Sequence, residues 1–291
     1  MIALRWSGAP ADLMIALHAR RSYDSIAAYA AEFPDRPLVV ALTGTDLYRD
    51  IQNDPNAQHA LALATRLIVL QEQGPDALPR ALRGKTRVIY QSARKIARPP
   101  PLASRFEVVV SGHLRDEKDP FRAAAALALL PVDSRIRLTH MGGAMSAEMK
   151  ARAEAYVAHE PRYRWLGELP QWRALRYLAR SRLMVISSTM EGGANVASEA
   201  LALGVPVIAS RIAGNVGMFG RDYPGYYAVG DERALARLLW RAESDPAYYE
   251  QLERHCRARA HLVSAEHERA GLESLLAELA TGALPGSRTA A

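Results

Sequence analysis

Two glutamates, Glu191 and Glu199, enclose a glycine pair at Gly192 and Gly193. The apolar run before this segment predicts a strand, and the residues from Asn195 onward predict a helix. Backbone N–H groups at the start of such a helix can bind an anion or another polar group. Two carboxylates about two helical turns apart serve different parts of one ligand, and a carboxylate can accept hydrogen bonds from both neighbouring hydroxyls of a ribose. The pattern predicts a socket for a phosphate or a sugar; the alternative is a pair of solvated glutamates around a packing turn.

The elements that would position this socket follow an α/β pattern, in which short apolar runs alternate with amphipathic stretches. This alternation is typical of a parallel sheet with helices on both faces, so we predict an α/β fold class with doubly wound domains. The expected strands are Ile2–Arg5, Leu13–Leu17, Leu38–Leu42, Leu67–Leu70, Val88–Tyr90, Phe106–Ser111, Arg135–Met141, Tyr163–Gly167, Leu183–Ser187 and Val205–Ser210.

The proline-rich stretch that ends at Pro101 suits a stiff linker, so we place a domain boundary there. The expected domains are residues 1–101 and 102–280, followed by a frayed tail over 281–291. The first expected strand, Ile2–Arg5, has no strand-and-helix unit before it, and a doubly wound domain usually has its phosphate-facing glycine turn after its first strand. We therefore expect the N-terminal domain to lack its first βα unit.

Composition excludes several classes of protein. The 291 residues are 49% hydrophobic and 23% charged, which is enough to bury one large core or two ordinary ones. Cys256 is the single cysteine, so no internal disulfide can form, and we expect a reducing, cytoplasmic compartment without structural zinc. No apolar run approaches the length of a membrane span and no signal peptide is apparent. The net charge is +6, but the arginines are dispersed, so we expect no nucleic-acid partner.

The segment from Glu191 to Glu199 resembles the E-x7-E region of family 4 glycosyltransferases, and Leu203-Gly-Val-Pro206 extends the resemblance. Over about Phe106 to Leu252, the resemblance implies a GT-B fold, in which two Rossmann-like domains face a cleft, and a UDP-sugar as donor substrate. It implies that Glu191 meets the donor sugar, as a catalytic residue, and that Glu199 holds the nucleotide ribose. The resemblance also assigns these residues to the donor site: Gly192, Gly193, Ala194, Asn195 and Val196.

A second match to this family lies in the segment Gly112-His-Leu-Arg-Asp-Glu-Lys118. Lys118 matches a diphosphate-binding lysine of the family, whereas His113 stands where the family has an arginine and Arg115 follows two residues later. His113, Arg115 or both could therefore take the arginine's role. Such cations make physical sense, because preorganised positive charge stabilises the charge that builds on a departing diphosphate. The alternative is a surface charge cluster in a strand-to-helix loop.

The N-terminal half resembles the family more weakly, at two expected strand ends that would face the cleft. His18, Arg20 and Arg21 follow one strand, and Thr43 follows the next. Many family members have a histidine where Thr43 stands, which suggests different acceptor chemistry. His18 could equally be a core or capping histidine, and each arginine could be a surface residue.

Taken together, these segments and Asp222-Tyr-Pro-Gly-Tyr226 resemble the selenosugar synthase family, SenB, of selenoneine biosynthesis. That resemblance implies transfer of a sugar, notably N-acetylglucosamine, from a UDP-sugar to selenophosphate, with release of UDP and phosphate. The implied acceptor site contains His18, Arg20, Arg21 and Thr43, with Arg49 as a further candidate cation. Interdomain closure would exclude water and align the substrates.

No Asp-x-Asp motif stands beside the donor turn, so neither a metal nor another cofactor is expected. Two other functions stay open from the sequence. One is transfer of a sugar to a hydroxyl acceptor by the same fold, and the other is nucleotide-sugar binding without catalysis. The hexose, the stereochemical outcome and the oligomeric state cannot be read from the residues.

Overall fold

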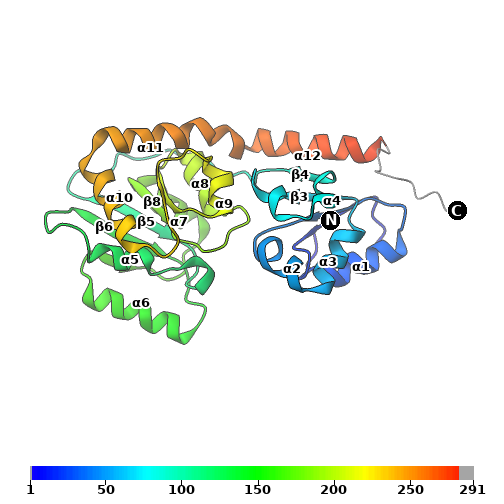
Figure 1. The fold of residues 1–291 in the computed structure, drawn as a ribbon, viewed down its shortest axis with the longest axis horizontal. Helices are drawn as coiled ribbons and strands as arrows, with labels where there is room; N and C mark the ends of the chain where they lie inside the picture. The colour runs from blue at the N-terminus through cyan, green and yellow to red at the C-terminus, as the bar shows by residue number, and fades with distance from the viewer. Residues whose placement is uncertain (1, 282–291) are drawn as a thin grey trace. The chain divides into compact units, whose positions relative to one another are not determined.

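The computed structural model describes residues 2–281, which divide into two compact units. Of these residues, the first unit takes 2–91, 191–193 and 266–281, and the second takes 92–190 and 194–265. Figure 1 labels the main helices and strands. Each unit is built on a parallel sheet with helices packed against it, so the predicted α/β class is confirmed.

The first unit has a four-stranded parallel sheet in the order β1-β2-β3-β4. Its strands are β1 (Met14–Leu17), β2 (Leu38–Ala41), β3 (Arg66–Val69) and β4 (Thr86–Val88). Its other elements are α1 (Tyr23–Glu32), the π-helix η1 (Asp46–Asp50), α2 (Ile51–Asn53), α3 (Pro55–Leu63), η2 (Gly74–Ala77), α4 (Arg80–Arg83) and most of α12 (Ala265–Ala280).

Both faces of this sheet are covered, which explains why β2 is apolar at every position. Leu38 and Val40 of β2 belong to the core cluster that contains residues of α1 and α3. Val39 and Ala41 point to the opposite face, where Leu275 of α12 completes a second cluster. At the edge of the sheet, Ile15 and Leu17 of β1 remain 44% and 66% exposed.

The second unit has a six-stranded parallel sheet in the order β10-β9-β8-β5-β6-β7. Its strands are β5 (Phe106–Ser111), β6 (Ile136–Met141), β7 (Tyr163–Trp165), β8 (Leu183–Ile186), β9 (Val207–Ser210) and β10 (Tyr226–Tyr227). The strand order reverses between β5 and β8, and in doubly wound sheets the carboxyl ends of strands at such a switch point hold the ligand. The loops that follow β5 and β8 are therefore expected to form a ligand site.

Eight helices and two short 3-10 turns complete the described part of the second unit and its connection to the first. The longer ones are α6 (Ala147–His159), α7 (Gln171–Arg180), α8 (Asn195–Leu203), α10 (Glu232–Ser244), α11 (Pro246–Arg259) and α12. The shorter ones are η3 (Asp116–Lys118), α5 (Arg122–Leu127), α9 (Ala213–Phe219) and η4 (Ala260–Val263). Among residues 2–281, no helix is long and apolar enough to cross a membrane.

One predicted strand is absent, one observed strand was missed, and one predicted strand is displaced. The segment Ile2–Arg5 is not a strand: Ile2 and Leu4 are fully exposed, so its alternating apolar residues meet no neighbouring strand. The two-residue strand β10 was missed, because so short a segment carries no periodicity. The strand expected at Val88–Tyr90 instead ends at Val88, as β4.

The expected domain boundaries also differ from the division into units. The last helix, expected in the second domain, joins the first unit, because Leu275 is buried in that unit's core and Glu278 accepts hydrogen bonds from Arg66 and Arg87. The expected linker joins the second unit, because Arg98 donates to three backbone carbonyls there. Apart from Thr281, the tail expected to fray lies outside the described residues.

Candidate functional site

The loop that follows β5 is fixed to the end of β8 through its backbone. The Ser187 hydroxyl oxygen lies 3.0 Å from the Lys118 carbonyl and 2.9 Å from that of Asp119, and can donate to either. The Thr189 N–H donates to the Glu117 carbonyl at 2.9 Å. Asp119 takes a left-handed conformation, with φ of 41°, where the turn η3 ends. These bonds hold the short turn η3 at the switch point of the sheet.

The structure brings Gly112, Arg115 and Lys118 together in this loop. A Cβ added to Gly112 would lie 3.7 Å from Cδ of Lys118, so the lysine stem passes over the glycine. Arg115 is half-buried, and its Nε is buried with no hydrogen-bond partner among the described residues. Buried polar groups are rarely left unpaired, which makes this guanidinium a candidate for a ligand contact.

His113 is exposed on the side of the loop that meets the segment after β6. Its Nδ1 would lie 3.5 Å from a Cβ added to Gly143. The neighbouring Gly142 could not bear a side chain, because its Cβ would lie 1.9 Å from the Gly112 carbonyl oxygen. The geometry thus sets His113 beside the β6 loop, whereas Arg115 and Lys118 lie in or next to the turn that is bonded to the end of β8.

Helix α8 begins at Asn195, as predicted, with Ala194 as its N-cap and no side-chain cap bond. Val196 lies in its first turn. The backbone N–H groups of this turn therefore have no side-chain acceptor at the N-cap position and can bind a ligand. The helix ends at Gly204, whose φ of +63° lies in the left-handed region that glycine adopts at little cost.

Glu199 lies one turn into α8 and is partly buried. Its Oε1 accepts a hydrogen bond of 3.3 Å from the side-chain amide of Gln171, the first residue of α7. Burial raises the pKa of the Glu199 carboxyl, and the Gln171 bond opposes this shift. The site residue Gln171 was missed by sequence reasoning, because nothing in the pattern indicates which polar residue meets one 28 positions away.

Glu191, Gly192 and Gly193 lie between β8 and α8, but the contacts group these three residues with the first unit. Glu191 is buried, and Gly193 has φ of +155°, a region in which a side chain would be strained. The structure therefore does not place these three residues in one unit with Lys118 and Glu199.

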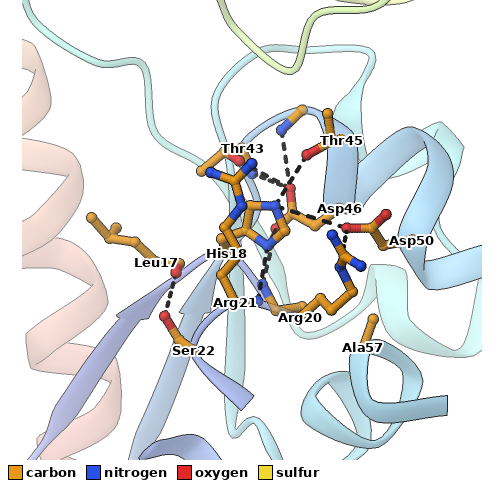
Figure 2. A network of polar contacts seen from close by, with 12 residues as sticks. Leu17, His18, Arg20, Arg21, Ser22, Thr43, Thr45, Asp46, Asp50 and Ala57 are labelled. Atoms are coloured by element: carbon orange, nitrogen blue, oxygen red, sulfur yellow. Dashed lines mark hydrogen bonds and ion pairs between the residues drawn. The ribbon is translucent and has the colours of Figure 1, made fainter. Parts of the chain in front are cut away.

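In the first unit, Asp46 organises the second set of candidate residues, as Figure 2 shows. This fully buried carboxylate accepts hydrogen bonds from the backbone N–H groups of Ala19, Thr43 and Gly44, at 3.0, 2.9 and 3.0 Å. The Thr43 hydroxyl donates to it as well, at 3.0 Å. The carboxylate thus joins the loops that follow β1 and β2, and it places Thr43 close to His18.

His18 is buried and adopts a left-handed conformation, with φ of 70°. Burial is the largest cause that lowers the pKa of its imidazole, so the ring is neutral at pH 7. The Arg21 N–H lies 3.3 Å from Nδ1, which makes Nδ1 an acceptor and leaves the proton on Nε2. Nε2 lies 3.1 Å from the Thr45 hydroxyl oxygen and 3.8 Å from Asp50.

Two half-exposed arginines share the buried carboxylate of Asp50. Nε of Arg20 lies 3.0 Å from Oδ2, and Nε of Arg49 lies 3.4 Å from Oδ1. Arg21 is exposed beside them (Figure 2). The structure therefore brings together His18, Arg20, Arg21 and Thr43, the four residues predicted for an acceptor. Sequence reasoning missed Asp46 and Asp50 as their anchors, although an aspartate three residues after a strand-end threonine is a recognisable turn signal.

One buried histidine, His140, lies near the end of β6, paired in register with Val110 of β5. Its Nδ1 is 3.0 Å from the Tyr163 hydroxyl, and burial lowers its pKa to about 4. The ring is therefore neutral and part of the support beneath the β5 loop. Across residues 2–281, no group of three or more histidine, cysteine, aspartate or glutamate side chains could hold a metal ion.

Comparisons with known proteins agree with this architecture. Residues 91–260 match the sequence profile of the family described as glycosyl transferases group 1. No curated protein matches the chain.

Many solved structures resemble the chain, and the three described here share a fifth of its residues or fewer. A sucrose-phosphate synthase from Thermosynechococcus elongatus is 20% identical, with a TM-score of 0.74 over 94% of this chain and 74% of that one. Anabaena HepE, solved in complex with UDP and glucose, is also 20% identical, with a TM-score of 0.74 over 91% and 78%. An alpha,alpha-trehalose-phosphate synthase (UDP-forming) from Burkholderia vietnamiensis is 11% identical, with a TM-score of 0.75 over 94% and 74%. These likenesses confirm the predicted GT-B fold class.

Proposed function

The chain belongs to the glycosyl transferases group 1 family, and from this premise we propose that it transfers a sugar from a UDP-sugar to selenophosphate. We propose N-acetylglucosamine as the sugar, and a selenosugar, UDP and phosphate as the products. Two observations support the donor: the solved HepE relative holds UDP, and the loop after β5 presents cations at the switch point of the second sheet.

The proposed donor site follows from the second unit. Lys118 and Arg115 bind the diphosphate and stabilise the charge that it gains on leaving. The first-turn amides of α8, at Asn195 and Val196, bind the donor's polar groups. Glu199 accepts hydrogen bonds from the ribose hydroxyls. The buried, unpartnered Nε of Arg115 is the observation that carries this assignment, because it provides a charged donor that awaits an acceptor.

The proposed acceptor site is the cluster in the first unit. Selenophosphate is an anion, and the guanidinium groups of Arg20 and Arg21 suit its phosphate oxygens. The basic nitrogen of the neutral His18 ring, Nδ1, accepts the Arg21 N–H, and Nε2 carries the proton beside Thr45, so neither nitrogen is poised to remove a proton from an acceptor. Selenophosphate needs little help from a base, because its selenium is already a polarisable anion. The cluster therefore fits an anionic acceptor better than a sugar hydroxyl.

In the proposed reaction, selenium attacks the anomeric carbon of the sugar. The carbon–selenium bond forms as the bond from that carbon to the UDP oxygen breaks, and UDP leaves with the electron pair. Water then cleaves the selenium–phosphorus bond, which releases phosphate and the selenosugar. The chain's own residues bind and orient both substrates and stabilise the charge on UDP.

The test is UDP release from UDP-N-acetylglucosamine, measured with and without selenophosphate, with the product identified by mass spectrometry. We expect release only with selenophosphate, and we expect the double variant Arg20→Ala/Arg21→Ala to lose turnover while it still binds UDP. Release with a sugar acceptor instead would identify a hydroxyl-directed glycosyltransferase. UDP binding with no release under either condition would identify a nucleotide-sugar-binding protein.

A further inference from the structure

A groove of about 870 Å³ lies in the second unit, between the segment 94–99 and the outer side of α7. Its apolar lining includes Ile96, Leu175 and Ala179, of which Leu175 and Ala179 also belong to the unit's buried core. One wall of the groove, the segment 94–99, is fixed to the end of α7, because the Arg98 guanidinium donates to the carbonyls of Ala179 and Ser181. It involves none of the residues assigned to the donor or the acceptor.

Four arginines line this groove and no carboxylate does: Arg94, Arg173, Arg176 and Arg180. None of the four has an ion pair with an acidic residue in the part of the chain that the structure describes. Arg98, in contrast, already donates hydrogen bonds to three backbone carbonyls. A concave surface lined with one sign of charge attracts ligands of the opposite sign.

Trp172 gives the groove an aromatic wall. Its side chain is 58% exposed, and the guanidinium carbon of Arg176 lies 5.1 Å from the centre of its ring. Tryptophan and arginine are the residues most often responsible for affinity at protein interfaces. An exposed tryptophan beside apolar lining and uncompensated cations therefore indicates an interaction surface.

We propose that this groove binds an acidic peptide segment of a partner protein. Its carboxylates pair with the arginines, and an apolar side chain between them packs against Trp172 and Ile96. The spacing suits this occupant: Arg173 and Arg180 are seven residues apart on α7, about 10 Å at 1.5 Å per residue. Side chains on one side of an extended peptide recur about every 7 Å, close to the rise of about 6 Å between Arg176 and Arg180. Two alternate glutamates can therefore meet two of these arginines, while the side chain between them turns to the other side.

Two other anionic partners fit the surface less well. A flat lipid surface cannot fill a hollow between a helix and a chain segment. Single-stranded nucleic acid prefers a row of exposed aromatic platforms along a basic channel. Apart from its arginines, this lining is mainly aliphatic, and of its two aromatic residues Trp172 is exposed and Tyr177 is half-buried.

The probe is a fluorescein-labelled eight-residue peptide of alternating glutamate and leucine, titrated with the full chain at about 150 mM salt and followed by fluorescence anisotropy. We expect saturable binding that weakens at least about tenfold in Arg173→Glu/Arg176→Glu. The matched control, Arg233→Glu/Arg237→Glu, makes the same charge change at exposed positions of α10 and should weaken binding less than about twofold. Circular dichroism verifies that both variants are folded.

Trp172→Ala tests the apolar part of the proposal. It should weaken binding of the glutamate–leucine peptide by about tenfold but leave a glutamate–serine peptide nearly unaffected. The proposal is overturned if the wild-type chain shows no saturable binding, or if both double variants lose affinity equally. It is also overturned if phosphatidylserine vesicles or an oligo-dT strand, and not the peptide, bind in a manner that depends on Arg173 and Arg176.

Discussion

The two candidate clusters are held together in different ways. In the first unit, the side-chain carboxylate of Asp46 accepts four hydrogen bonds and so fixes the loops around His18 and Thr43. In the second unit, the loop that carries Lys118 is fixed through its backbone carbonyls by the Ser187 hydroxyl.

This difference separates side chains that maintain the fold from side chains that bind a ligand. The proposed acceptor cluster depends on buried, charged side chains, so a substitution at its centre should destabilise the fold of the first unit as well as any ligand binding. The loop after β5, proposed to bind the donor, keeps its shape through backbone contacts. Substitutions of its Arg115 and Lys118 side chains should therefore weaken ligand binding and leave the fold intact. The following predictions test this contrast, from the largest expected effect to the smallest.

The largest effect is expected for Asp46→Ala, which leaves four buried or partly buried hydrogen-bond donors without their acceptor. The free energy of unfolding of the first unit should fall by about 3 to 5 kcal/mol. Trp6 packs against Tyr29 in this unit, 5.5 Å between ring centres, so its fluorescence during urea unfolding reports on the unit when the other three tryptophans are replaced by phenylalanine.

Asp24→Ala, an exposed position on α1, is the matched control and should change the same free energy by less than about 0.5 kcal/mol. A loss below about 1 kcal/mol for Asp46→Ala would remove the anchor role.

The second effect is a pH dependence that arises from His140. Its pKa is about 4 in the folded chain against a usual value of 6.5, so below pH 6.5 the unfolded chain binds a proton that the folded chain refuses. Stability should therefore fall as the pH drops from 7 to 4, by on the order of 3 kcal/mol for this group. His140→Gln should remove that part of the pH dependence in urea unfolding, whereas His159→Gln, an exposed position on α6, should retain it. Equal slopes for wild type and His140→Gln would contradict the assignment.

Sequence patterns predicted the central strands and the edge strands β1 and β7, but they missed the edge strand β10 and displaced the edge strand β4, for a physical reason. Strands such as β2 and β8 are buried on both faces, and their continuous apolar runs record that burial. The apolar residues of Ile2–Arg5 show a similar local pattern but have no neighbour to pack on. Likewise, the amphipathic pattern of α12 indicates a buried face without indicating which core buries it.

Predictions for the candidate site had the same limit: local patterns do not record contacts between residues far apart in the chain. Asn195 as a helix start follows from local signals, whereas the cations Arg115 and Lys118 were assigned through the resemblance to a family. The partners Asp46 and Gln171 depend on contacts between residues far apart in the chain, which no local pattern records.

A smaller effect, on binding alone, is expected for Glu199→Gln. The change should weaken UDP binding by about 1 to 3 kcal/mol, or about 5- to 150-fold in Kd, while unfolding shifts little. Because burial raises the pKa of Glu199, the wild-type carboxylate becomes protonated at a higher pH than an exposed glutamate. UDP affinity should therefore decline as the pH falls through that raised pKa, and Glu199→Gln should lose this decline. Isothermal titration calorimetry with UDP from pH 5 to 8 measures both, and unchanged affinity would remove Glu199 from the donor site.

The smallest effect on stability is expected for Arg20→Gln, and it decides how far the contrast between the clusters extends. Arg20 pairs with Asp50 but is 46% exposed, and ion pairs with an exposed partner contribute little because water screens them. We therefore expect urea unfolding of the first unit to change by less than about 1 kcal/mol, although the residue lies in the same cluster as Asp46. If selenophosphate-dependent UDP release falls nonetheless, the cluster consists of a buried anchor that maintains the fold and an exposed rim that binds the acceptor. A large loss of stability would instead make Arg20 part of the buried anchor. The residues that bind the acceptor would then have to lie elsewhere.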